Sequence, residues 1–311
     1  MQFALDPDLQ EAKPLRKSHR ARKAILALSC AIVCASALPA AAGAVVVGIG
    51  DQGTGMFSDP LFQALGVKEA RLTVSWDVAV NGKRHSELAN DTTWLNDAAA
   101  DHVTPLISFS GNGNYIPNVA QYTKAVKAFM KKFPKVKRYT PWNEPDWVYR
   151  SISRHPLLAA SFYNSLKRNC KHCTVLAGDL YLPAGPLARW IKAYRKGLHA
   201  HVDGWALHNY YDVREHNANQ LKALQKLTKG PIWLDEISGV ERRGHWQFKN
   251  QSAAAANNDE KYLFSLPKKY RRVSRIYHYQ WQSAPTAGWD SGLIDAEGKA
   301  RPAYYTLKAA I

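Results

Sequence analysis

The sequence is short of cysteine, methionine and acidic side chains. Its 311 residues include 4 cysteines and 3 methionines, and 25 acidic residues stand against 42 basic ones. Two cysteines fall in an apolar N-terminal stretch, which leaves Cys170 and Cys173 in CKHC and no second pair to complete a zinc site. In an oxidising compartment this pair would close a local disulfide; a redox motif or half of a zinc site is the sharper alternative.

Other absences narrow the class of protein. The histidines show no HExxH or similar spacing, so we expect no catalytic metal and no cofactor. Nucleic-acid-binding motifs are missing as well. No linker rich in proline, glycine and serine divides the chain after residue 43, which indicates one domain over residues 43–311.

One stretch alone is apolar and long enough to enter a membrane. Residues 24–42 carry no charge and follow a basic stretch at 13–23, which is typical of a secretory signal with an Ala-x-Ala cleavage site. Acidic residues before the basic stretch leave a retained single-span anchor as the alternative. We therefore expect a signal peptide over residues 1–42, a secreted, extracellular or cell-surface protein, and no stable membrane insertion.

The charge of the chain favours anionic partners. The formal net charge is +17, and removing residues 1–42 takes away six basic and three acidic residues and leaves +14. Such a surface suits nucleic acid, an acidic polysaccharide or a cell envelope, and export argues against nucleic acid. The basic residues concentrate in 124–138 and 268–275, where a solvated outer helix face is the simpler interpretation. We expect a monomer.

From Gly43 onward, β-branched or aromatic runs alternate with helical patterns at intervals of roughly thirty residues. Eight such pairs predict an α/β fold, a single closed (β/α)₈ or TIM barrel. Residues 239–256 are expected to form a loop after the seventh strand. The predicted strands, each with its helix, are 45–50 with 58–66, 69–76 with 88–101, 104–111 with 118–133, 136–144 with 155–169, 174–181 with 186–198, 203–211 with 217–229, 231–238 with 257–270, and 274–282 with 301–310.

The first strand carries the glycine pattern GIGDQG at 48–53. In a dinucleotide site the helix opens inside such a motif, so that its N-terminus meets the pyrophosphate. Here the helix is expected later, with Ser58 as its N-cap and Pro60 in its first turn. We interpret the glycines as a flexible first loop.

Two glutamates stand at the predicted ends of strands. Glu144, in TPWNEPDW at 140–147, closes the fourth strand, and Glu236 closes the seventh. The C-terminal ends of barrel strands converge on one mouth, so both carboxylates can face each other there. Glycoside hydrolysis needs such a pair, one carboxyl to protonate the leaving oxygen and one to attack the anomeric carbon. A single carboxylate at the end of a strand is usually a solvent-exposed residue that caps the strand. The presence of two such glutamates is what points to glycoside hydrolysis.

Asn143-Glu144-Pro145 with a second glutamate on the seventh strand resembles the retaining glycoside hydrolases of clan A, the superfamily of cellulases, mannanases, β-xylosidases and β-1,3-glucanases. The resemblance implies double displacement on a poly- or oligosaccharide, with Glu144 as acid/base and Glu236 as nucleophile. A non-catalytic polysaccharide or cell-wall binding protein and a transglycosidase are the alternatives. Substrate-binding roles are implied for Asn143 at the sugar 2-hydroxyl, Arg71 near the nucleophile, His208 and Tyr210 in His-x-Tyr with the tyrosine holding the nucleophile, and Trp281 under the sugar.

Strand alternation adds expectations of its own. In PIWLDEIS, Ile232, Leu234 and Glu236 would share the lumen face and Asp235 would point towards the helices. Asn143 and Glu144 cannot both point inward on a regular strand, so we expect a bulge or the strand's end there.

Charge and aromatic content complete the predicted site. A buried Arg71 needs a partner, and Glu236 is the natural one; the charge of Glu236 and apolar surroundings would favour the protonated form of Glu144. Asp179 is expected to bond its own loop rather than substrate. Core packing is the better interpretation for Trp190 and Trp205, and it is an equal alternative to substrate binding for Trp142. The tryptophans expected near the mouth, where flat rings stack on sugars, are Trp142, Trp147, Trp246, Trp281 and Trp289.

Overall fold

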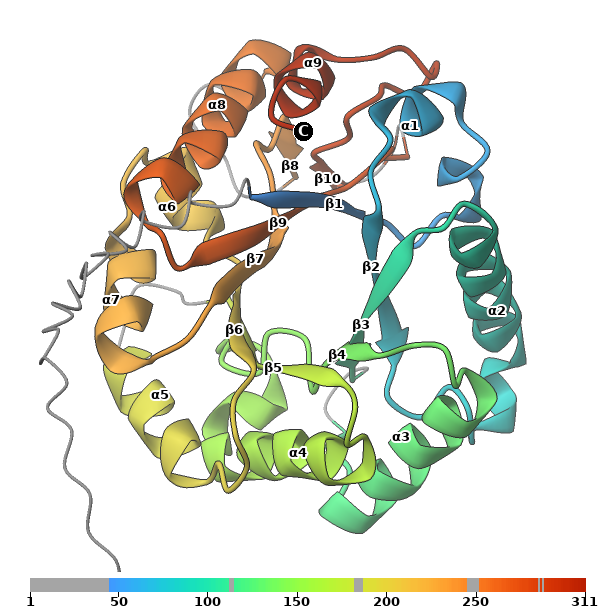
Figure 1. Cartoon of the computed structure of the whole chain (residues 1–311), viewed down its shortest axis with the longest axis vertical. Coiled ribbons are helices and arrows are strands. Elements are labelled where there is room, and N and C mark those ends of the chain that lie inside the picture. Colours follow the sequence, from blue (N-terminus) through green and yellow to red (C-terminus); the bar gives the residue numbers. More distant parts are fainter. Residues whose placement is uncertain (1–44, 112–114, 182–186, 245–251, 285, 287) are drawn as a thin grey trace, which may run out of the picture. The chain divides into compact units, whose positions relative to one another are not determined.

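The computed structural model describes most of the chain after the predicted signal peptide. The signal peptide, residues 1–42, and Trp246 lie outside the described residues, so both remain predictions. None of the described helices is both long and apolar enough to cross a membrane. The described residues are 45–111, 115–181, 187–244, 252–284, 286 and 288–311 (Figure 1).

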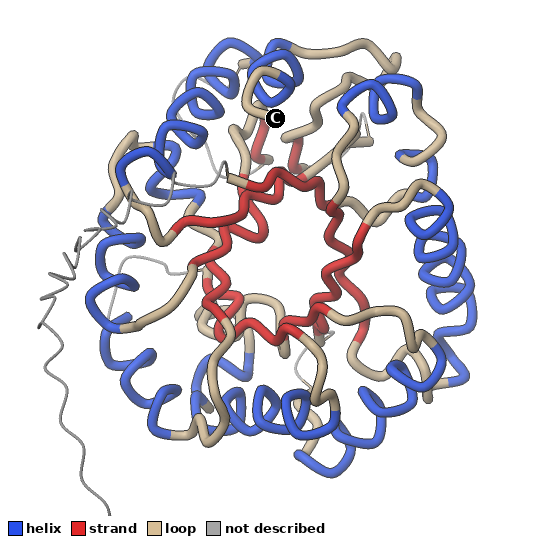
Figure 2. The backbone as a smooth tube through the Cα atoms, in the orientation of Figure 1, coloured by secondary structure: helices blue, strands red, loops and turns tan. Residues whose placement is uncertain are grey.

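Eight parallel strands close into a barrel in chain order, with the helices around it (Figure 2). The predicted (β/α)₈ TIM barrel is therefore confirmed. Its strands are β1 (Val46–Gly50), β2 (Glu69–Ser75), β3 (Thr104–Ser110), β4 (Arg138–Thr140), β5 (Thr174–Leu180), β6 (Gly204–Leu207), β7 (Ile232–Ile237) and β9 (Val273–Tyr279).

Helices follow these strands at the predicted places, and local capping explains where two of them begin. The carboxylate of Asp59 accepts the N–H of Leu61, so Asp59, one residue beyond the predicted Ser58, is the first N-cap. Asn118 and Gln121 form a reciprocal capping box. The helices are α1 (Pro60–Leu65), α2 (His85–Ala100), α3 (Val119–Lys132), α4 (Pro156–Asn169), α5 (Leu187–Lys196), α7 (Asn219–Leu227), α8 (Ala253–Lys269) and α9 (Pro302–Lys308).

Three features near the strand ends differ from the prediction. β4 and β6 stop at Thr140 and Leu207, several residues early, and a short helix, α6 (Tyr210–Arg214), directly follows the sixth strand. The predicted loop after β7 contains β8 (Arg242–Arg243), which pairs antiparallel with β10 (Trp289–Asp290). These segments lie beyond the C-terminal ends of the barrel strands, where the site is expected.

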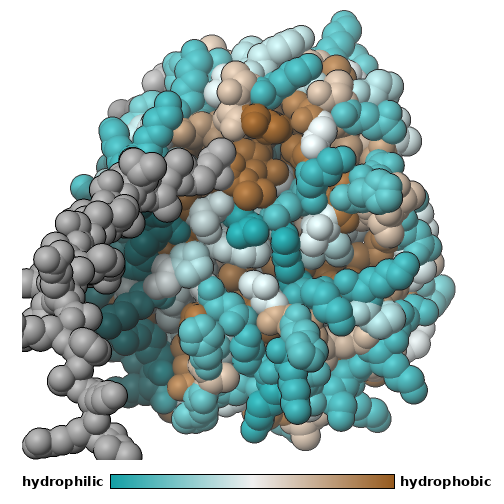
Figure 3. All heavy atoms as spheres, viewed as in Figure 1, coloured by the Kyte–Doolittle hydropathy of each residue, from teal (hydrophilic) through white to brown (hydrophobic). Residues whose placement is uncertain are grey.

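The core has two parts. A large cluster fills the space between barrel and helices, and a small one, made of Leu106, Leu176, Ala206, Trp233 and Tyr277, fills the barrel lumen. On α3 the buried residues recur at helical spacing while its lysines stay exposed. Hydrophilic side chains likewise cover much of the face in Figure 3, which agrees with a solvated exterior.

Two motifs acquire structural roles. Cys170 and Cys173 form the local disulfide just after α4. No α-helix opens within GIGDQG; a 3₁₀ turn, η1 (Thr54–Met56), comes next. The carboxylate of Asp51 in this motif accepts the backbone N–H groups of Gly53 and Trp281, which ties the first loop to the end of the eighth barrel strand.

Candidate active site

Glu144 and Glu236 meet at one end of the barrel. An oxygen of each lies within 4.8 Å of the other, and a nitrogen of His208 lies within the same distance of both. Glu144 follows β4 in a left-handed backbone conformation, with φ of 50°, and its N–H donates to the carbonyl of Asp179. β4 has already ended at Thr140, so the expected end of the strand before Asn143 and Glu144 is confirmed.

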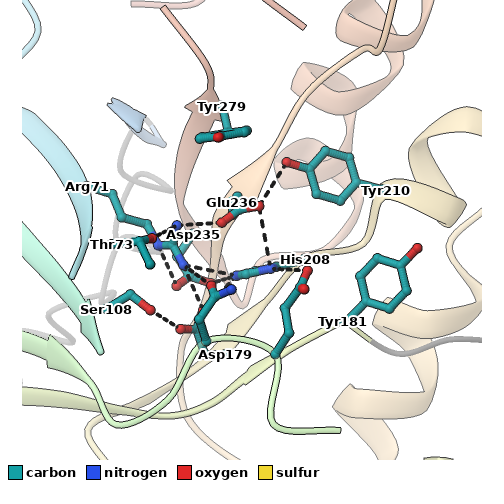
Figure 4. Close-up of polar contacts among 12 residues, drawn as sticks. Arg71, Thr73, Ser108, Asp179, Tyr181, His208, Tyr210, Asp235, Glu236 and Tyr279 are labelled. Carbon is teal, nitrogen blue, oxygen red and sulfur yellow. Dashed lines mark hydrogen bonds and ion pairs between the residues drawn. The ribbon is translucent and has the colours of Figure 1, made fainter. Parts of the chain in front are cut away.

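Arg71, on β2, is the cation around which the site is built (Figure 4). Its side chain is 1% exposed, and Nη1 lies 2.6 Å from Oε2 of Glu236. Nη2 donates to Oδ1 of Asn143 at 2.7 Å and to Oδ1 of Asp179 at 3.3 Å. The predicted pairing of Arg71 with Glu236 is therefore present, and the same guanidinium also orients Asn143.

Asp179 does not bond its own loop, contrary to the prediction. Its side chain is fully buried at the end of β5 and accepts hydrogen bonds from Ser108 and Thr140 on the two preceding strands. Nε2 of His208 lies 2.6 Å from its Oδ1. Asp179 is thus an inner anion, linked to Arg71 and His208 beneath the two glutamates rather than to solvent or loop.

The prediction that Asp235 points towards the helices is wrong. Its carboxyl is fully buried, 3.5 Å from Nε of Arg71 and 3.7 Å from Nε2 of His208. The apolar lumen residue of β7 is Trp233, whereas Ile232 and Leu234 pack in the outer cluster. The ladder between β7 and β9 shifts register between Leu234 and Ile237. This irregularity lets consecutive acids, Asp235 and Glu236, both face the interior.

His208 and Tyr210 converge on the glutamates from the end of β6, as predicted. Nδ1 of His208 lies 3.2 Å from Oε1 of Glu144. Tyr210, the first residue of α6, donates its hydroxyl to Oε1 of Glu236 at 3.3 Å. Each oxygen of Glu236 therefore has a donor, Tyr210 on one and Arg71 on the other, which leaves the carboxylate little freedom to turn.

Burial and charge set the protonation of the inner layer. Burial alone would raise the pKa of Asp179, but the charges of Arg71 and His208 outweigh it and lower that pKa. Burial would lower the pKa of His208, yet Glu236 and Asp179 raise it well above its ordinary value. Burial, together with the charge of Asp179, raises the pKa of Asp235. These shifts favour the neutral form of the Asp235 carboxyl and the charged form of the His208 ring.

Two of the tryptophans predicted to bind substrate do not reach the site. Trp281 is 3% exposed and donates to Asp59, with its ring edge-on to Phe62 at 5.5 Å between centroids. Trp142 is also 3% exposed and stacks on Phe162 of α4. Both side chains point into the layer between the barrel and its helices, so they serve packing.

The aromatic ring from the eighth barrel strand is Tyr279 instead. It is the last residue of β9 and appears among the polar side chains of the site in Figure 4. Burial and the charge of Glu236 raise the pKa of its phenol. Its position at the end of the strand could have identified Tyr279 as a site residue. The sequence pattern favoured Trp281 instead, because this second aromatic residue follows two positions later.

Other predicted aromatic residues do line the rim. Trp147 lies 5.5 Å from Tyr181 between ring centroids, and Trp289 lies 5.1 Å from Tyr210 in an edge-to-face arrangement. Tyr181 lies on the same side of the site as Tyr210 in Figure 4. Trp190 and Trp205 pack in or against the large cluster, as expected. The site thus pairs an ionic floor with aromatic walls.

Two groups of donors are close enough to hold a metal ion. They are Glu144, His208 and Glu236, and Asp179, His208 and Asp235. In both groups the negative charge already faces the guanidinium of Arg71, and the raised pKa of His208 favours the form of its ring that cannot bind a metal. The carboxylates of both groups therefore already face Arg71 and His208 as counter-ions.

Comparison with known proteins shows which protein family the chain resembles. A family model described as a glycosyl hydrolase catalytic core matches residues 108–305. The search of curated proteins found no match. Solved structures with the same fold include a family 39 glycoside hydrolase from Bacteroides cellulosilyticus WH2, with 15% identity, a TM-score of 0.59, and coverage of 85% of this chain and 63% of that one.

Two further solved structures cover nearly the same part of this chain. Xylanase 10B from Thermotoga maritima has 13% identity and a TM-score of 0.59, with coverage of 86% of this chain and 94% of that one. A GH5_18 protein from Streptomyces cattleya, in complex with GlcNAc, has 12% identity and a TM-score of 0.63, with coverage of 86% and 79%. At these identities the likeness concerns the fold.

Proposed function

The chain belongs to the glycosyl hydrolase catalytic core family, and we propose that it is a clan A glycoside hydrolase that cleaves a glycosidic bond with retention. The observation that carries this proposal is the separation of Glu144 and Glu236, whose nearest oxygens lie within 4.8 Å. Retaining enzymes hold their two carboxyl groups about 5–5.5 Å apart, whereas inverting enzymes need about 6.5–9.5 Å to admit a water.

In the proposed first step, Glu144 donates its proton to the glycosidic oxygen as the bond to the anomeric carbon breaks. An oxygen of Glu236 attacks that carbon and forms a glycosyl ester. Arg71 and Tyr210 hold the attacking carboxylate in place, through Oε2 at 2.6 Å and Oε1 at 3.3 Å. Asn143, fixed by Arg71 through its Oδ1, keeps its amide nitrogen for a sugar hydroxyl.

In the second step, water attacks the anomeric carbon of the ester. Glu144, now ionised, takes the proton from that water, and Glu236 leaves as a carboxylate. His208 contacts Glu144 at 3.2 Å and so orients it in both steps. The product keeps the anomeric configuration of the substrate, because the carbon is inverted twice.

The test combines conservative and small replacements of the two glutamates. Glu236→Gln and Glu144→Gln should each lower turnover by several orders of magnitude on a panel of β-glucans, mannan, xylan and uronic-acid polymers. Azide should restore turnover in Glu236→Gly and form a glycosyl azide of inverted anomeric configuration. It should also restore turnover in Glu144→Gly, where the glycosyl azide keeps the configuration of the substrate. Glu215→Gln is the control, because Glu215 is exposed and paired with Arg214. Full activity in Glu236→Gln would end the proposal.

Export is the second part of the proposal. It is supported by the basic and apolar stretches within residues 1–42 and by the disulfide between Cys170 and Cys173, since disulfides persist in oxidising compartments. The mature protein should start at Gly43. Terminal sequencing of protein recovered from the medium of an expressing culture checks this, and full-length protein confined to the cells would contradict it.

A further inference from the structure

Two hollows lie at the end of the barrel opposite Glu144 and Glu236. The larger hollow, about 530 Å³, is bordered by the first residues of β4 and β5 and by Arg275 near the start of β9. The smaller hollow, about 300 Å³, lies between the end of α3, which packs beside α4 (Figure 1), and the segment that leads into β5. Cys170 borders the smaller hollow and Cys173 the larger one. Their disulfide therefore joins the walls of two neighbouring hollows.

The carboxylates next to the larger hollow already have cationic partners. Asp203, in its wall, pairs with Lys167. Glu69, buried at the start of β2, lies 2.7 Å from Nη1 of Arg138 and 2.9 Å from Nε of Arg275. Both arginines border the same hollow. The three cations of these pairs therefore exceed the two carboxylates by one charge.

Four lysines of the two hollows have no such partner. Lys171 borders the larger hollow, and Lys127, Lys131 and Lys137 border the smaller one, whose described wall contains no acidic residue. All four are exposed, and within the described part of the chain no carboxylate pairs with their ammonium groups. Asp101, an acidic residue in another segment that leads into a strand, borders neither hollow. These lysines are therefore available to an anion from outside the chain.

The two ends of the barrel differ in charge. The seven segments that lead from a helix into the next barrel strand carry seven basic and two acidic residues. The eight segments that lead from a barrel strand to the main helix after it, and so include the site, carry ten basic and eleven acidic residues. Among the connecting segments, the excess of positive charge therefore lies at the end opposite the site. The seven segments are 66–68, 101–103, 133–137, 170–173, 197–203, 228–231 and 270–272.

Helix ends account for only part of this charge. A lysine in the last turn of a helix is favoured by the helix dipole, and Lys131 in α3 has such a place. Lys137 and Lys171 lie in loops, where that effect does not stabilise them. Their position beside the hollows needs another explanation, which a bound anion supplies.

The surface at this end favours an acidic polysaccharide over nucleic acid or a lipid bilayer. The indole of the larger hollow, Trp233, is buried and has the guanidinium of Arg275 over its ring at 4.1 Å, so it is not free to stack on bases. Among the described residues, the exposed large hydrophobic side chains at this end are Val46 and Ile311, which are too few to insert into a bilayer. Two adjoining hollows with lysines in both suit a chain whose charges recur along its length.

We propose that this end of the barrel binds an acidic polysaccharide, with anionic groups beside Lys137 in the smaller hollow and Lys171 in the larger one. The inference goes beyond the proposed function, since binding here breaks no bond. An ammonium group is a compact point charge, so it binds carboxylate and sulfate alike. The positive field of this end attracts the polymer at long range. Because the site lies at the other end, a bound polymer leaves the mouth of the barrel open.

The experiment removes one lysine from each hollow. Oligomers of galacturonic and mannuronic acid and a sulfated glucan, each with its neutral counterpart, are titrated into purified protein that carries Glu236→Gln, so that binding is measured without cleavage. At least one acidic oligomer should bind, and more tightly than its neutral form, with an affinity that falls as salt rises. Lys137→Gln combined with Lys171→Gln should weaken this binding about 5- to 30-fold, the effect of losing two exposed charge pairs.

The matched control removes the same charge from the other end of the barrel. Lys83 and Lys299 are exposed and lie in segments that leave β2 and β9. Lys83→Gln combined with Lys299→Gln should change the affinity by less than about 2-fold, because salt screens charges that lie far from the bound polymer. A difference between the two double variants therefore reports the hollows rather than the net charge.

Three results would overturn the inference. The first is that no acidic oligomer binds at low salt, and the second is an equal loss of affinity in the two double variants. The third is tighter binding of duplex DNA or of anionic lipid vesicles, with the same loss in the variant of Lys137 and Lys171. The proposed function is tested separately, because with Glu236 restored both double variants should keep the turnover of the wild type. Absence of turnover in the wild type would contradict the proposed function and leave the binding result unaffected.

Discussion

Replacing Asp235 by asparagine tests whether the inner carboxyl is neutral. Asp235 is fully buried, and its pKa is raised first by burial and then by the charge of Asp179. Asparagine has the same shape and offers an N–H where the acid offers its proton. We therefore expect Asp235→Asn to change the free energy of unfolding by less than about 1 kcal/mol at pH 7, the scale of one neutral hydrogen bond.

Asp179→Asn should behave differently, because Asp179 is the ionised member of the pair. Removing one partner of a buried ion pair costs about 3–5 kcal/mol. Asp235 lies 3.5 Å from Arg71 and 3.7 Å from His208, so it can ionise in this variant and restore part of the lost charge. We expect a loss near the lower end of that range. The double variant has neither inner carboxylate, so no second acid can replace the lost charge. Its loss of unfolding free energy should exceed the sum of the losses in the two single variants by at least about 1 kcal/mol.

Urea unfolding of the four proteins at pH 7 measures these free energies. Infrared spectroscopy provides a direct readout, since a protonated carboxylic acid has a carbonyl stretch. The difference spectrum between the wild type and Asp235→Asn should contain one such band, while the band of Glu144 is common to both proteins and cancels. The opposite pattern would refute the reasoning: an Asp235→Asn loss as large as that of Asp179→Asn, or strictly additive losses in the double variant. Either result would mean that Asp235 is charged in the folded protein.

Three further predictions concern the surroundings of the site. Gly111→Ala should destabilise the fold by about 1–3 kcal/mol in urea unfolding, since its Cβ would lie 2.1 Å from Cζ2 of Trp142. Trp281→Phe should lower the melting temperature and leave KM for substrate unchanged, because its indole is buried and bonds to no site residue. Hydrogen bonds from Arg301 outweigh burial and lower the pKa of Asp290. The free energy of unfolding of the wild type should therefore exceed that of Asp290→Asn by its full amount near pH 6, and this difference should disappear as the pH falls below about 4.

The barrel could be predicted because its signals are long and repeat. Each strand is a short apolar run, each helix has an amphipathic period, and eight repeats average out local errors in length. The ends of strands were less predictable. β4 and β6 stop early, although the N–H groups of Asn143, Glu144 and His208 still donate to backbone carbonyls of adjacent strands. The side chains of these three residues contact side chains from other elements of the barrel. Those contacts depend on tertiary proximity, which a local pattern does not contain.

The register of β7 could not be read from alternation for a physical reason. Strands of a parallel barrel are buried on both faces, so inward and outward positions are both apolar. The alternation of apolar and polar residues that would distinguish the two faces is therefore missing from the sequence. Ile232 and Trp233 are both buried, yet the first packs in the outer cluster and the second in the lumen. For the same reason the sequence predicted Trp281, rather than Tyr279, as the aromatic residue that contacts substrate. The two residues lie two positions apart at the end of one strand.

Asp235 and Glu236 show why two neighbouring acids can have opposite chemistry. Glu236 lies at the mouth, partly exposed, and receives a donor on each oxygen. Asp235 lies one residue deeper, fully buried beside an anion that Arg71 and His208 already balance. A second inner negative charge would repel that of Asp179, and this repulsion together with burial raises the pKa of Asp235 and favours its neutral form. Arg71 therefore remains available to Glu236, and the proposed nucleophile depends on a neighbour that never touches the substrate.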